Sequence, residues 1–67
     1  MTFADKVKFV RIKLNLSQED LARELGVSFA TINRWENGSY NPSHLAKKAF
    51  EDFCQKQNIV IEEEAVQ

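Results

Sequence analysis

Residues 16–42 read LSQEDLARELGVSFATINRWENGSYNP, and they predict two short helices joined by a tight turn. Ser17 is a good N-cap, and Asp20 three residues later forms a variant of the capping box. Gly26 is predicted to end the first of these helices, because glycine takes a positive φ without steric cost. Ser28 then caps the second helix, which runs to the next glycine.

The turn at Gly26 and Val27 decides how the two helices meet. It is too short for them to lie antiparallel, so they must cross at a steep angle, which is helix-turn-helix geometry. Ala22 is small where the helices approach, and the crossing is expected to be packed by larger apolar side chains: Leu21, Leu25, Val27, Ile32 and Trp35. The side chains left exposed on the second helix are then Phe29, Ala30, Thr31, Asn33, Arg34 and Asn37. Small and polar residues on a projecting helix suit entry into the major groove of DNA.

Another helix is predicted before this unit. Thr2 can cap it, with Asp5 completing a second variant of the capping box. Asn15 is expected to end it, because Asn tolerates the left-handed conformation. Phe9 and Ile12 lie off its apolar stripe, which consists of Phe3, Val7, Val10 and Leu14.

A fourth helix is predicted after the unit. Pro42 can open it with Asn41 as the cap, and Ser43 is an alternative cap. Cys54 is expected to be a small buried hydrophobe. The helix should fade near residues 57–58, and one face is marked by Leu45, Ala49 and Phe53, with Phe50 beside it.

The 67 residues fit one domain, which we place at residues 1–58, followed by an apolar and then acidic tail at 59–67. The net charge is -1, but Glu62, Glu63 and Glu64 carry three of the ten carboxylates. Residues 1–61 hold a net charge of +2, so non-specific DNA affinity should be modest and salt-sensitive. Residues 59–61 are β-prone and apolar. We hypothesise that the tail folds back onto the first helix or pairs with a second chain. The reason is that a small protein rarely leaves apolar groups such as Phe9, Ile12 and residues 59–61 exposed together.

The ordered pattern along the chain resembles the Cro/C1-type (XRE-like) helix-turn-helix family of DNA-binding domains. The matching residues are Arg11, Leu16-Ser17-Gln18, Leu21-Ala22, Gly26-Val27-Ser28, Ile32, Arg34-Trp35-Glu36-Asn37-Gly38 and Pro42-Ser43. The resemblance runs from about Val7 to Phe53. It implies an all-α fold, a compact bundle of four to five short helices like the lambda-repressor DNA-binding domain.

The resemblance also implies roles for single residues. Base contacts fall on Phe29, Ala30, Asn33 and Arg34, and phosphate contacts on Gln18, Ser28, Thr31, Asn37 and Tyr40. Arg11 and Glu36 match a partly buried structural ion pair between the first and third helices. Phe29 and Ala30 depart from the polar residues of many members, and they suit contact with a thymine methyl group. Arg34 is then the best candidate for bidentate pairing with guanine.

The resemblance implies a sequence-specific transcriptional regulator of bacterial or phage type, with helix 28–37 in the major groove and a homodimer on a palindrome. One alternative is an antitoxin-like protein-interaction module that uses the tail as its contact. Another is the DNA-binding part of a larger DNA-modifying protein. Phe29 is equally suited to a base contact or a protein interface, whereas Trp35 is expected in the core because it shares a face with Ile32.

Several classes of function are not expected. The sequence has no Cys/His cluster, paired catalytic carboxylates or nucleophile–base arrangement, so no enzyme, cofactor or metal site is predicted. No apolar run approaches the roughly 20 residues that span a bilayer, and the N-terminus does not resemble a signal peptide. A single cysteine, Cys54, suits a reducing cytoplasm, which is the expected location.

Overall fold

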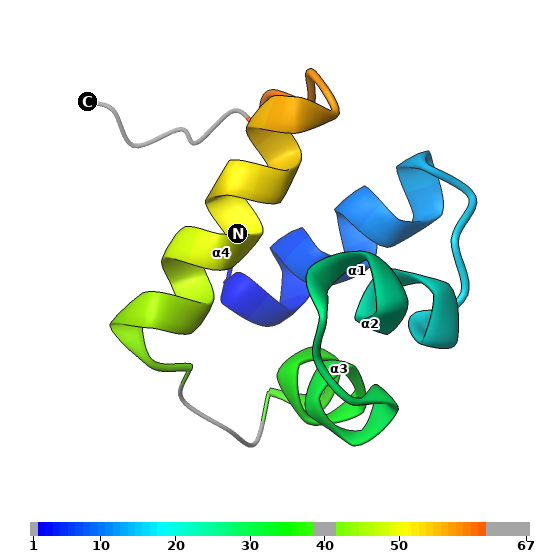
Figure 1. The fold of residues 1–67 in the computed structure, drawn as a ribbon, viewed down its shortest axis with the longest axis vertical. Helices are drawn as coiled ribbons and strands as arrows, with labels where there is room; N and C mark the ends of the chain where they lie inside the picture. The colour runs from blue at the N-terminus through cyan, green and yellow to red at the C-terminus, as the bar shows by residue number, and fades with distance from the viewer. Residues whose placement is uncertain (1, 39–41, 62–67) are drawn as a thin grey trace.

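Residues 2–38 and 42–61, which a computed structural model of the protein describes, form four α-helices and confirm the all-α prediction. In chain order they are α1 (Phe3–Lys13), α2 (Gln18–Leu25), α3 (Phe29–Asn37) and α4 (His44–Lys56). Figure 1 shows α4 along one side of the molecule and α2 on the other, with α3 seen nearly end-on below them. The short α2–α3 turn therefore changes the chain direction steeply, as its length predicted.

Hydroxyl side chains start the first two helices as the sequence predicted. Thr2 Oγ1 accepts from the backbone N–H of Asp5 at 3.1 Å, and Ser17 Oγ accepts from that of Asp20 at 3.0 Å. Each aspartate returns a bond by accepting from the N–H of its cap residue, at 3.4 and 3.2 Å respectively. Both capping boxes are therefore complete, and each one satisfies two of the backbone donors that a helix start leaves unpaired.

A left-handed residue follows each of the four helices of the described chain, and after α4 it is Asn58 with φ of 58°. Asn15 takes φ of 59°, as expected for the residue that ends α1. Gly26 and Gly38 are the C-caps of α2 and α3, with φ of 71° and 73°. At Gly26 this conformation lets the next residue, Val27, donate its N–H back to the carbonyl oxygen of Ala22 at 3.0 Å, which closes the turn.

The predictions for α4 need two corrections. The helix begins at His44, and Ser43 caps it by accepting from the N–H of Ala46 at 3.1 Å, so the alternative cap is the one used. Pro42 precedes the helix, and Asn41 lies outside the described residues. The predicted face was also wrong in part, because Leu45 is 77% exposed. The helix turns a neighbouring stripe inward instead, made of Ala46, Phe50, Phe53 and Cys54, with Ala49 left exposed like Leu45.

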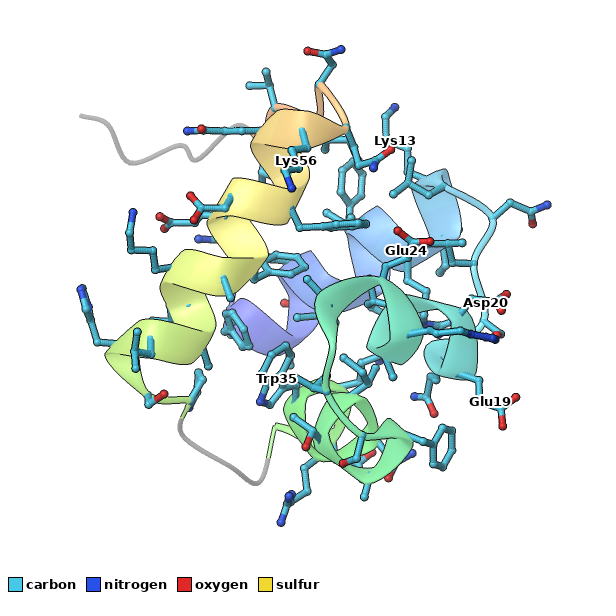
Figure 2. All side chains as sticks on the ribbon, in the orientation of Figure 1. Lys13, Glu19, Asp20, Glu24, Trp35 and Lys56 are labelled. Atoms are coloured by element: carbon cyan, nitrogen blue, oxygen red, sulfur yellow. The ribbon has the colours of Figure 1, made fainter. Side chains whose placement is uncertain are left out.

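The core combines side chains from all four helices. Its buried members are Val7, Val10, Leu21, Ala22, Ile32, Trp35, Phe50, Phe53, Cys54 and Ile59. Phe3 joins three helices, because its ring makes edge contacts with Trp35 at 5.2 Å and Phe50 at 5.5 Å between centroids. Trp35 therefore lies in the core as predicted, on the side of α3 that faces α4 (Figure 2).

Two residues near the end of the described chain are also core members. Cys54 is buried as predicted, and loss of hydration raises the pKa of its thiol. Ile59 is only 7% exposed, so the core continues past the end of α4. Val60 is 80% exposed, while Ile61 packs partly against the core.

Candidate nucleic-acid interface

One face of α3 carries the four residues for which base contacts were predicted, together with Asn37, for which a phosphate contact was predicted. Phe29, Ala30, Asn33, Arg34 and Asn37 recur at spacings of one and four residues, so they share one side of the helix. Phe29 is 51% exposed, and Ala30, Arg34 and Asn37 are exposed as well, while Asn33 is half-buried. The opposite side carries the buried residues Ile32, Trp35 and Glu36. The structure thus presents one continuous face on a helix whose other side is fixed in the core.

The start of α3 brings together two of the residues for which phosphate contacts were predicted. Ser28 caps the helix by accepting from the N–H of Thr31 at 3.2 Å, and the two hydroxyl oxygens lie 2.9 Å apart. Ser28 is exposed and Thr31 half-buried. The positive end of the α3 dipole lies at this position, and such a helix end favours an anion such as a phosphate. Tyr40, another predicted phosphate contact, lies outside the described residues.

A buried ion pair ties α1 to α3. Arg11 Nε donates to Glu36 Oε2 at 2.6 Å, and Nη2 donates to Oε1 at 3.1 Å, so the contact is bidentate. The side chain of Glu36 is 4% exposed and that of Arg11 is 21% exposed. Donating to the carboxylate of Glu36 raises the pKa of Arg11, while Arg11 Nη1 also donates to the carbonyl oxygen of Leu16 at 3.2 Å. The pair therefore fixes α3 against α1, and the bond to Leu16 ties Arg11 to the α1–α2 loop just before α2 begins.

A row of side-chain amides continues from this ion pair to the exposed face of α3. Gln18 Nε2 donates to Glu36 Oε1 at 3.1 Å, and Asn33 Nδ2 donates to Gln18 Oε1 at 3.2 Å. Asn37 Nδ2 then donates to Asn33 Oδ1 at 3.1 Å. We refer to Glu36, Gln18, Asn33 and Asn37 as the amide relay. These bonds were not predicted from the sequence, although the i, i+4 spacing of Asn33 and Asn37 was a signal for the last of them.

Carboxylates lie close to the candidate interface. Figure 2 shows Glu19, Asp20 and Glu24 along α2, on the side of the molecule away from α4. Arg23 forms an exposed ion pair with Asp20 at 3.0 Å, and hydrogen bonds from Ser17 hold the pKa of Asp20 below its ordinary value. The carboxylates of α2 repel phosphate.

Other features of the described residues lie away from this face. A hollow of about 500 Å³ lies between α1 and α4, and Phe3, Lys6, Phe50 and Ile59 are among its lining residues. No residue for which a DNA contact was predicted lines it. Within residues 2–38 and 42–61, no three His, Cys, Asp or Glu side chains group in a way that suits a metal ion. In the same part of the chain, no helix has the length and apolar character to cross a membrane.

Comparisons with known proteins agree with this geometry. A family model described as helix-turn-helix matches residues 7–43. An uncharacterised HTH-type transcriptional regulator of Methanocaldococcus jannaschii is 54% identical over 39 residues, which are 58% of this chain and 59% of that protein. A second uncharacterised HTH-type transcriptional regulator, from Archaeoglobus fulgidus, is 47% identical over 38 residues, which are 57% of this chain and 54% of that protein.

A longer relative matches more of the chain. The HTH-type transcriptional activator BcrR of Enterococcus faecalis is 38% identical over 53 residues, which are 79% of this chain and 26% of the activator. The matched part of the chain thus spans a little over half of the two uncharacterised regulators and about a quarter of the activator. No solved structure gives a significant match. The matched residues 7–43 include α2, α3 and the ion pair, which are the elements that build the candidate interface.

Proposed function

The chain belongs to the helix-turn-helix family of DNA-binding transcriptional regulators, and on that premise we propose that α3 reads base edges in the major groove of double-stranded DNA. The observation that carries the proposal is the face of α3 that lies opposite its buried side. A helix held by its apolar side and exposing small and polar side chains on the other suits insertion into a groove. Base contacts are proposed for Phe29, Ala30, Asn33 and Arg34.

Each proposed base contact follows from the chemistry of the side chain. Arg34 is exposed and carries the fork of donors that pairs with O6 and N7 of guanine. Phe29 and Ala30 are exposed and cannot hydrogen-bond through their side chains, so they suit the methyl group of thymine. Phosphate contacts are proposed for the residues at the helix ends, namely Gln18, Ser28, Thr31 and Asn37, and for Tyr40.

We further propose that two copies bind one operator. A single recognition helix covers only a few base pairs, so useful specificity requires a homodimer on a palindrome. Phe9 and Ile12 on α1 are 39% and 65% exposed, and they offer apolar surface away from the buried side of that helix. The net charge of -1 makes non-specific attraction to DNA weak, so base contacts must supply much of the preference. The cytoplasm is the proposed location.

The proposal is tested by selecting binders from a pool of randomised DNA duplexes at low salt with the purified full chain. A short enriched palindrome is the expected result, and it gives the operator. Arg34→Ala should relax the preference for guanine at one position of each half-site by about 1–3 kcal/mol. Lys48→Ala removes an exposed cation of α4 and serves as the control. A wild-type protein that enriches no sequence would overturn the proposal.

A second candidate function is a module that joins DNA binding to a protein contact. The chain matches only 26% of the length of the activator BcrR, so a similar unit occurs within a longer protein. This favours a module that is joined to other parts of a protein. The 80% exposure of Val60, next to the acidic tail, also favours it. Antitoxin-like neutralisation of a partner and attachment to a DNA-modifying enzyme are both forms of this candidate. Co-purification of the product of an adjacent gene would support it, and a chain that purifies alone and selects a palindrome would not.

A further inference from the structure

The amide of Gln18 is held at both ends, and its orientation is dictated by charge. Nε2 lies 3.1 Å from Glu36 Oε1, and Oε1 lies 3.2 Å from Asn33 Nδ2. A carboxylate only accepts hydrogen bonds, so the nitrogen of Gln18 must face Glu36 and its oxygen must face Asn33. Arg11 keeps the carboxylate paired on its other side. The ion pair thus fixes the orientation of the Gln18 amide, with Nε2 toward Glu36 and Oε1 toward Asn33.

The same reasoning extends to Asn33. Because the oxygen of Gln18 faces it, Asn33 must present Nδ2 there, and its Oδ1 then accepts from Asn37 Nδ2 at 3.1 Å. A flip of the Asn33 amide by 180° would place Asn33 Oδ1 against Gln18 Oε1, and the bond to Gln18 would be lost. Asn33 is also half-buried, which limits other rotamers. Its donor and acceptor therefore have a fixed order on the exposed side of α3.

The two bonds leave Asn33 one N–H and one oxygen lone pair. This combination matches N7 and N6 of adenine, the base that Asn pairs with bidentately in the major groove. We propose that Gln18 and Glu36 are positioning residues that make Asn33 a reader of adenine. The inference rests on the proposed function, because it requires α3 in the major groove. If the Asn33 amide were flipped, its Nδ2 donor would face the N6 donor of adenine. The orientation of the amide therefore determines whether Asn33 can pair with adenine.

The positioning role of Gln18 is measurably distinct from the phosphate contact proposed for the same residue, and Gln18 Nε2 keeps a second N–H besides the one donated to Glu36. A phosphate contact adds affinity evenly across sequences, because phosphates carry no base identity. Orientation of Asn33 changes the preference at one base position and leaves the other positions alone. The preference for guanine assigned to Arg34 therefore serves as an internal reference in the same experiment.

Gln18→Met is the informative variant, since it removes both ends of the amide while keeping a long side chain. Arg11 still pairs with Glu36, so the fold is retained, which the backbone amide NMR spectrum checks. Gln55→Met makes the same change at an exposed position of α4 and is the matched control. In the absence of DNA, the side-chain amide NMR signals of Asn33 should shift toward those of an exposed Asn in Gln18→Met. The same signals should not shift in Gln55→Met. Unchanged signals in Gln18→Met would overturn the positioning role.

Duplex selection with the full chain then tests recognition. The wild type should prefer adenine at one position by about fivefold or more, and Gln18→Met should reduce this to about twofold or less while the guanine preference persists. Asn33→Ala identifies the position by losing the same preference. An even loss of affinity with the adenine preference intact would overturn the inference but leave the proposed function standing. A wild type that enriches no sequence would overturn the proposed function, and the adenine assignment with it.

Discussion

The Arg11–Glu36 pair allows a quantitative test of how α3 is fixed in the fold. Arg11→Met removes two hydrogen bonds to Glu36 and one to the carbonyl oxygen of Leu16. The carboxylate that remains has a side chain only 4% exposed, and Gln18 is then the one partner that still donates to it among the described contacts. The variant therefore leaves a nearly buried negative charge without its counter-charge.

Removing one partner of a buried ion pair costs about 3–5 kcal/mol. The side chain of Arg11 is 21% exposed, so water already screens part of this pair, and we expect about 3 kcal/mol. For a domain of this size that corresponds to a fall of about 12–24 °C in Tm. Replacing both residues by Met removes the stranded charge as well. The double variant should therefore be more stable than Arg11→Met alone, by about 1 kcal/mol or more.

Urea unfolding followed by the fluorescence of Trp35 measures these differences, because Trp35 is the single tryptophan of the chain and only 3% exposed. Lys48→Met is the control: it breaks an exposed pair with Asp52 at 3.9 Å and should change the free energy of unfolding by less than about 1 kcal/mol. An Arg11→Met protein within about 1 kcal/mol of wild type would refute the reasoning. A double variant less stable than the single one would refute it equally.

Three further predictions concern the core, the turn and a helix start. Ile59→Ala should lower the free energy of unfolding by about 2–5 kcal/mol because it opens a cavity, while Val60→Ala at an exposed site should stay within about 0.5 kcal/mol. Equal effects in urea unfolding would place Ile59 outside the core. Gly26→Ala should cost about 1–2 kcal/mol from φ of 71° alone, since nothing lies within 4 Å of an added Cβ; a variant with unchanged Tm contradicts this. Asp20 has a lowered pKa because Ser17 hydrogen-bonds its charged form, so its stabilisation is present above about pH 4 and is lost as the pH falls through the lowered pKa. The Tm of Asp20→Asn should therefore lie below that of wild type at neutral pH and converge with it in acid, and a constant difference would contradict the assignment.

Features encoded by neighbouring residues could be predicted from the sequence. The capping boxes at Thr2 and Ser17 depend on bonds across three residues, so the residue types alone indicate them. The left-handed residues Asn15 and Gly26 follow from backbone sterics at single positions. Trp35 belonged to the core because it shares a helical face with an apolar neighbour. Each of these inferences required only local geometry.

Features that depend on which side of a helix meets its neighbour were harder to predict. On α4, two adjacent stripes are both apolar, and periodicity alone does not say which one faces inward. The structure turns Phe50 and Cys54 inward and leaves Leu45 exposed. The bond between Gln18 and Asn33 joins positions 15 residues apart and depends on the α2–α3 crossing, so no sequence spacing signals it. The proposed contacts to DNA are not signalled by sequence spacing either, because they depend on the geometry of a bound partner.

The hydroxyl caps have a consequence for the chain before it folds. Each of the four helices of the described chain begins with a Thr or Ser that accepts a backbone N–H from three residues later. Such bonds require no tertiary contact, so they form transiently in the denatured ensemble and bias it toward native helix starts. Nucleation is the unfavourable step of helix formation, and the caps lower its cost at the correct places. The unfolded protein thus already favours the boundaries of its helices, and collapse has mainly to select their mutual orientation.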